Sequence, residues 1–114
     1  MIMGLFGKKK YEKNMTRDNQ FLKSYAIKVN GLINFVQDNE KVANELEALK
    51  HDFQYSIGTS SKANKKLEKK IEDDYQALSD MLVQSSWDEN EVIRQVRIIR
   101  QTIVEITSNR DGIV

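Results

Sequence analysis

The sequence predicts an all-α protein, an antiparallel up-down four-helix bundle, on three observations. Apolar residues recur every three or four positions along four successive stretches, which is the spacing of one buried helix face. The chain has no proline to interrupt a helix and no cysteine to form a disulfide framework. Its 114 residues suffice for one domain with one core. The four apolar stripes are Phe21, Leu22, Tyr25, Val29, Leu32 and Val36; Val42, Leu46, Leu49, Phe53 and Ile57; Leu67, Ile71, Tyr75, Leu78 and Leu82; and Val92, Val96, Ile99, Ile103 and Ile106.

The first helix is predicted from about residue 16 to about residue 37, and two alternatives compete with it. Asn30-Gly31 between alternating apolar residues is typical of a β-hairpin, but a lone hairpin is marginal and no other segment resembles a strand. In a helix, Gly31 costs about 1 kcal/mol unless it permits close packing or a kink. The second alternative is one long helix over residues 16–57. Asp38 and Asn39 are good N-cap types, so we favour a separate second helix that starts at Glu40.

The later helix ends carry capping signals. Gly58 is expected to end the second helix in the left-handed conformation, and Thr59 to Ser61 to link it to a third helix from about Lys62 to Gln84. The fourth helix can start in two registers, with Ser86 paired to Glu89 or with Asp88 paired to Glu91. In the second register Trp87 and Val92 occupy the positions of a hydrophobic staple. The alternative role for Trp87 is an exposed aromatic anchor for a partner.

Residues 1–15 are predicted to form a flexible basic leader, separate from a single helical-bundle domain at 16–114, because Gly4 and Gly7 break any helix there. Residues 1–17 hold five basic residues against the single acid Glu12, a net charge of +4 in a chain whose total is +1, so the remainder carries −3. Apolar side chains followed by lysines are the ingredients of a peripheral membrane anchor. The alternative is a disordered, solubilising leader. The membrane-contact candidates are Leu5, Phe6, Lys8, Lys9 and Lys10.

The start of the third predicted helix is a second basic feature. Cations there repel one another at i,i+4 and oppose the helix dipole, although the acids from Glu68 to Asp74 offset much of this cost. A solvated mixed-charge face is the simpler interpretation, and a stripe that binds phosphates of lipid or nucleic acid is the alternative. A general nucleic-acid binder is usually more basic than this chain, which makes nucleic acid the weaker partner candidate. The anion-binding candidates are Lys62, Lys65, Lys66 and Lys69.

The sequence offers little catalytic chemistry. The only histidine, His51, projects away from the apolar stripe, and without cysteine it cannot build a conventional zinc site. No glycine-rich phosphate loop is present, and the carboxylates fan around helices or cap their starts. We therefore expect no enzyme activity, no metal and no cofactor.

The predicted function is a non-catalytic helical-bundle module for protein interaction or scaffolding, peripherally tethered to the inner face of a membrane. The lack of cysteine fits a reducing, cytoplasmic location, and no apolar run is long enough to span a bilayer. One alternative is nucleic-acid or phosphate binding through the lysines of the third helix. Another is a small immunity or antitoxin-type protein, by analogy of size and fold alone. The expected partners are an unidentified protein, an anionic membrane surface or a second copy of the chain.

Overall fold

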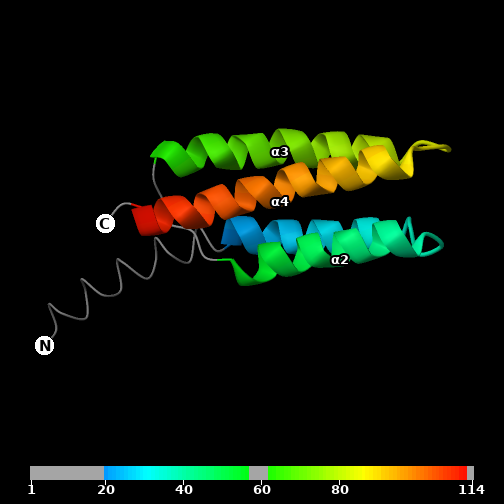
Figure 1. The fold of residues 1–114 in the computed structure, drawn as a ribbon, viewed down its shortest axis with the longest axis horizontal. Helices are drawn as coiled ribbons and strands as arrows, with labels where there is room; N and C mark the ends of the chain where they lie inside the picture. Colours follow the sequence, from blue (N-terminus) through cyan, green and yellow to red (C-terminus); the bar gives the residue numbers. More distant parts are fainter. Residues whose placement is uncertain (1–19, 57–61, 113–114) are drawn as a thin grey trace, which may run out of the picture.

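The computed structural model describes residues 20–56 and 62–112, with the side chains of 62, 63 and 109–112 excepted. The described residues form four helices and no strand: a first helix whose described part is 20–33, then α2 (Glu40–Tyr55), α3 (Lys62–Leu82) and α4 (Glu89–Gly112) (Figure 1). We call the first one the N-terminal helix. The all-α four-helix bundle is therefore confirmed. The hairpin alternative is wrong, because Asn30 and Gly31 both lie inside the N-terminal helix.

Successive helices alternate in direction along the chain. The N-terminal helix and α3 run one way, and α2 and α4 run the other (Figure 1). Spatial neighbours are not always sequence neighbours, because α4 lies between α3 and α2 and packs against both. α2 and α4 are thus parallel neighbours, and the chain between α2 and α3 joins two helices that lie on opposite sides of α4.

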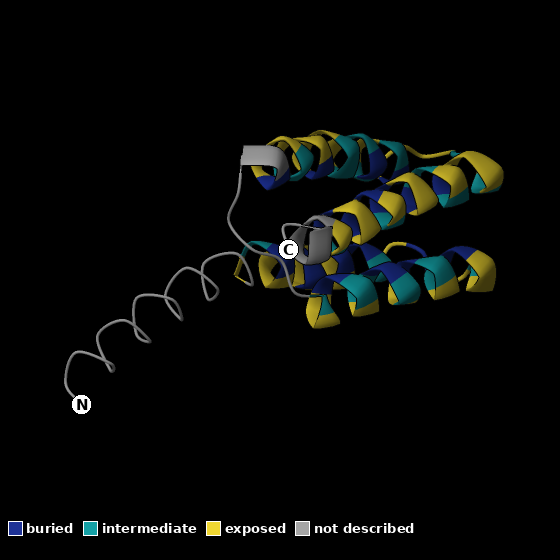
Figure 2. Cartoon of the chain, turned by 60° about the vertical axis from the view of Figure 1, so that its left-hand side comes forward, coloured by how far each residue is buried: buried dark blue, intermediate teal, exposed yellow. Residues whose placement is uncertain are grey.

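The core consists of the predicted stripes. Every described stripe residue is either buried or packed against the buried cluster, and Figure 2 shows the buried positions along the inner side of each helix. Phe53, Leu46, Leu78 and Ile99 are completely inaccessible to solvent. Ile57, the last member of the second stripe, lies outside the described residues. Burial of these apolar side chains is the main force that holds the four helices together.

The turn between the N-terminal helix and α2 separates two helices, so the single long helix is wrong. The last helical residue is 33, four positions before the expected end at 37. The chain tightens there through i→i+3 hydrogen bonds, from the Phe35 amide to the Leu32 carbonyl (3.0 Å) and from the Val36 amide to the Ile33 carbonyl (3.1 Å). This tightening keeps Val36 buried and leaves Phe35 64% exposed.

Two predicted N-caps are confirmed. Asn39 Oδ1 accepts a hydrogen bond from the Val42 amide (3.0 Å) at the start of α2. Asp88 Oδ1 accepts one from the Glu91 amide (3.1 Å) at the start of α4, which selects the second of the two predicted registers.

Two helix ends differ from the prediction. α2 ends at Tyr55 with Ser56 as its C-cap, whereas Gly58, the expected end, lies outside the described residues. Ser56 is extended (φ −80°, ψ 146°), and its amide still donates to the Asp52 carbonyl, so α2 ends before Gly58. α3 ends at Leu82 rather than Gln84, after a final bond from the Val83 amide to the Ser79 carbonyl (3.1 Å).

Candidate functional site

The outward face of the N-terminal helix is basic and partly apolar. Ile27 is 75% exposed, and Lys23, one turn earlier, lies on the same face. The sequence contains no acid between Asp18 and Asp38, so no carboxylate belongs to this helix over its described length. Apolar side chains that enter the lipid interface beside lysines are the ingredients of a membrane-contacting face.

A groove continues this face toward α2. It has a volume of about 430 Å³, and we call it the basic groove. Lys50 Nζ donates to Asn30 Oδ1 (3.2 Å) across it and lies 3.9 Å from Glu47 Oε2. Glu47 does not line the groove, which therefore holds two ammonium groups and no carboxylate. The lining residues are Lys23, Ala26, Ile27, Asn30, Lys50 and Gln54.

The other side of the N-terminal helix is tied to α3 by aromatic rings. Lys28 Nζ lies 4.4 Å from the centroid of the Tyr25 ring, and the Tyr75 hydroxyl donates to the Lys28 carbonyl (3.3 Å). Burial, and then the charges of Glu72 and Asp73, raise the pKa of Tyr25 above its ordinary value. Burial, and then Tyr25, raise the pKa of Tyr75 in the same way. These rings orient Lys28 and hold the helix in place.

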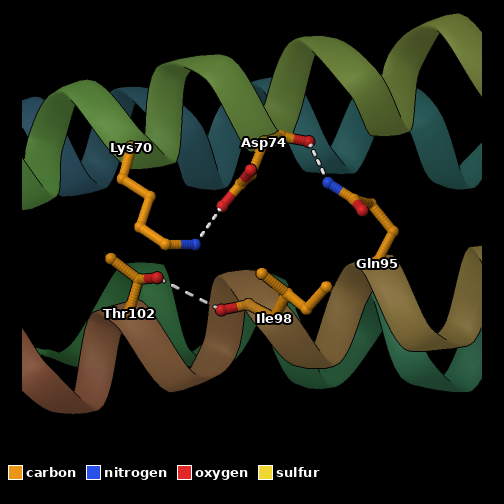
Figure 3. A network of polar contacts seen from close by, with 5 residues as sticks. All are labelled: Lys70, Asp74, Gln95, Ile98 and Thr102. Atoms are coloured by element: carbon orange, nitrogen blue, oxygen red, sulfur yellow. Dashed lines mark hydrogen bonds and ion pairs between the residues drawn. The ribbon is translucent and has the colours of Figure 1, made fainter.

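The α3 lysines are accompanied by acids. Lys69 Nζ lies 3.0 Å from Asp73 Oδ1, and this hydrogen bond raises the pKa of Lys69. Lys70 Nζ lies 2.6 Å from Asp74 Oδ2, at the seam with α4, where Gln95 Nε2 donates to the Asp74 carbonyl (2.8 Å) (Figure 3).

Of the four anion-binding candidates, Lys65 and Lys66 are exposed and Lys69 is exposed but paired with Asp73, while the side chain of Lys62 lies outside the described residues. The acids beside this stripe lie one turn further along α3 itself, and anion binding there stays a prediction.

The α4 arginines join α4 to α2. Arg97 Nη2 lies 2.9 Å from Glu45 Oε1, and Arg100 Nε lies 2.6 Å from Asp52 Oδ2. These pairs could not be predicted from the sequence, because about fifty positions separate the partners and no local spacing connects them. They link two parallel helices across their surface, and each arginine is paired with a carboxylate.

Trp87 lies at the junction of α3 and α4. It packs partly buried against the core and lines a hollow of about 460 Å³, which we call the distal hollow. Its packing against the core agrees with the predicted structural role of Trp87, and its role as an anchor for a partner stays a prediction. The lining residues are Met81, Gln84, Ser86, Trp87, Asp88, Glu91 and Val92.

His51 is exposed, and its ring centroid lies 4.5 Å from that of Tyr55. Within residues 20–56 and 62–112, no cluster of three or more acids and histidines could hold a metal, and no helix is both long and apolar enough to cross a bilayer.

The leader candidates Leu5, Phe6, Lys8, Lys9 and Lys10 lie outside the described residues. In the comparisons with known proteins, no family model, curated protein or solved structure matches the chain. The surfaces described above are therefore the basis for a functional proposal.

Proposed function

We propose that the protein is a non-catalytic interaction or scaffold module held at an anionic membrane surface by the basic leader and by the outward face of the N-terminal helix. The observation that carries this proposal is the exposure of Ile27 beside Lys23 and Lys50, on a helix that has no carboxylate over its described residues 20–33.

Two contributions add up on such a surface. An exposed apolar side chain that enters the lipid interface contributes hydrophobic free energy, and each lysine near anionic lipid contributes about 1 kcal/mol. Neither contribution alone gives stable attachment, which is why peripheral proteins combine them. The basic groove supplies both contributions, the apolar one from Ile27 and the electrostatic one from Lys23 and Lys50.

The distribution of acids supports this orientation. Every acidic residue among the described positions lies at Asp38 or later, on α2, α3, α4 and their connections. A membrane contact through the N-terminal helix therefore brings the cationic helix to the lipid first. The carboxylates of the other helices then repel the anionic lipid less than they would if one of those helices faced the membrane. The reason is that screened repulsion falls off over a Debye length of about 8 Å.

The proposal is tested by co-sedimentation with vesicles of phosphatidylcholine alone and of phosphatidylcholine mixed with phosphatidylserine. We expect the full chain to sediment with the anionic vesicles and much less with the neutral ones. Deletion of residues 1–13 and the substitutions Ile27→Ser and Lys23→Gln should each reduce sedimentation. Val104→Ser is the matched control, since Val104 is a 53% exposed apolar residue on α4.

The possible outcomes separate the parts of the proposal. Equal sedimentation with and without residues 1–13 would remove the leader as tether. If Ile27→Ser and Val104→Ser behave alike, the N-terminal helix does not take part in the contact. No association of the full chain with anionic vesicles at low salt would overturn the proposal as a whole.

A further inference from the structure

The distal hollow lies at the opposite end of the bundle from residue 20, where the described chain begins. The connection between α3 and α4 is at the right of Figure 1, whereas the N-terminal helix begins toward the left. The distal hollow is separate from the basic groove, with which it shares no lining residue.

The chemistry of the distal hollow is the reverse of that of the basic groove. Its lining contains the carboxylates of Asp88 and Glu91 and no lysine or arginine. Asp88 uses Oδ1 to cap α4, which leaves its second oxygen available. The nearest cation along α4 is Arg94, one turn beyond Glu91, and Arg94 lines a different surface hollow on α4.

Apolar surface accompanies these charges. Packing against the core holds Trp87 in place, so its ring is preorganised beside the hollow. Met81 adds a polarisable side chain to the lining, and Val83, in the adjacent connection, is 62% exposed. Tryptophan is the aromatic residue that attracts cations most strongly across its face, and carboxylates nearby reinforce that attraction.

We propose that the distal hollow binds a lysine- or arginine-bearing segment of a partner protein. The cation lies against the Trp87 ring and the carboxylates of Asp88 and Glu91, and apolar neighbours in the segment contact Val83 and Met81. Charge complementarity selects this occupant, because the lining has two acids and no base. The volume of about 460 Å³ admits more than one side chain.

Trp87 provides the experimental signal, because it is the only tryptophan of the chain. The full-length protein is titrated, without vesicles, with the peptide acetyl-Arg-Leu-Arg-Leu-Arg-Leu-amide, and the Trp87 emission is followed. We expect a saturable change in emission whose midpoint moves to higher peptide concentration as salt is added. The same peptide with glutamate in place of arginine should give no change.

Substitutions localise the binding. Asp88→Asn retains a good N-cap while it removes the charge, so the fold should be preserved. Combined with Glu91→Gln it should weaken peptide binding by about fivefold or more. The matched control is Glu105→Gln with Glu72→Gln, which removes the same total charge from exposed sites on α4 and α3. Thermal melting of both double variants verifies that each is folded.

Three outcomes would overturn the inference: no emission change at low salt, equal peptide affinity for the double variant and the wild type, or an equal loss in the control. A peptide of residues 1–13 is titrated in parallel. If it binds more tightly than the arginine peptide, the occupant is the leader of a second copy and the separate partner is excluded. Because no lipid is present, failure here leaves the vesicle experiment unaffected.

Discussion

Asn39 connects the start of α2 with the start of α4 through Glu89, which lies fifty positions further along the chain. Its Oδ1 accepts from the Val42 amide (3.0 Å) in the first turn of α2, and its Nδ2 donates to Glu89 Oε1 (2.9 Å), the first residue of α4. An asparagine amide supplies an acceptor and a donor at once, which a serine or aspartate cap cannot do with the same geometry. Both helices are parallel, so the Glu89 carboxylate lies near the positive ends of both helix dipoles.

The first prediction follows from this double role. Asn39→Asp keeps an N-cap acceptor but replaces the donor to Glu89 with a carboxylate, so we expect a loss of about 1 kcal/mol in the free energy of unfolding. Glu89→Gln should recover much of that loss in the double variant, because its amide can donate to the new aspartate. Urea denaturation of the four proteins gives the coupling energy. Additive effects of the two substitutions would show that the contact contributes nothing to stability.

The second prediction concerns Gly31. A Cβ built at this position meets no atom within 4 Å, and no glycine among the described residues has a positive φ. Close packing against another helix therefore does not require glycine here. Gly31→Ala should raise the free energy of unfolding by about 0.5–1 kcal/mol, by lowering the entropy of the unfolded chain and improving helix propensity. A destabilised Gly31→Ala protein would show that the turn after residue 33 needs the flexibility of glycine.

The sequence predicts the core of this bundle well because each helix buries one regular stripe. Val96 and Ile99 are buried, and the spacing of apolar residues within their own helix predicts this without any knowledge of the other helices. The placement of α4 beside α2 has no local cause. Glu45 and Asp52 meet Arg97 and Arg100 only after the helices have packed, and the sequence marks none of the four as a partner of another.

Helix ends were predicted unevenly for a related reason. Asn39 and Asp88 act on amides three residues ahead, so their roles follow from sequence alone. The end of α2 at Tyr55 does not follow from the sequence, because a glycine such as Gly58 permits a left-handed cap without requiring one. The helix ends earlier, with Ser56 as its C-cap. Of the proposed surfaces, the sequence singles out Trp87 as a candidate residue, whereas the basic groove depends on the packing of Lys50 beside Asn30.

The third prediction compares core and surface positions. Leu46, Leu78 and Ile99 are fully buried, so alanine at any of them should lower the free energy of unfolding by about 2–5 kcal/mol through lost burial and a cavity. His51→Ala should cost far less, because His51 is exposed and contacts mainly the ring of Tyr55. Chemical denaturation of the four variants tests this. A loss at His51 as large as that at Leu46 would mean that α2 buries a different face.

The last prediction is a loss of stability at alkaline pH. The rings of Tyr25 and Tyr75 lie 5.1 Å apart, and burial raises the pKa of both above the ordinary value of 10.0. At pH values above 10 the unfolded chain therefore loses these protons while the folded protein keeps them. The unfolded state then binds fewer protons than the native state, so the free energy of unfolding falls as pH rises.

Tyr25→Phe isolates the contribution of one hydroxyl, because it removes the titrating group and keeps the ring that contacts Phe53 and Tyr75. We expect this variant to lose less stability than the wild type between about pH 9 and pH 11 in urea denaturation. Lys69 also makes the free energy of unfolding fall as pH rises, because its hydrogen bond to Asp73 raises its pKa. This pair is exposed, so its contribution to stability is small. Lys69→Gln should therefore change the dependence of the free energy of unfolding on pH less than Tyr25→Phe does. The opposite ranking would place the alkaline sensitivity on the surface of α3 rather than in the aromatic contact between the N-terminal helix and α3.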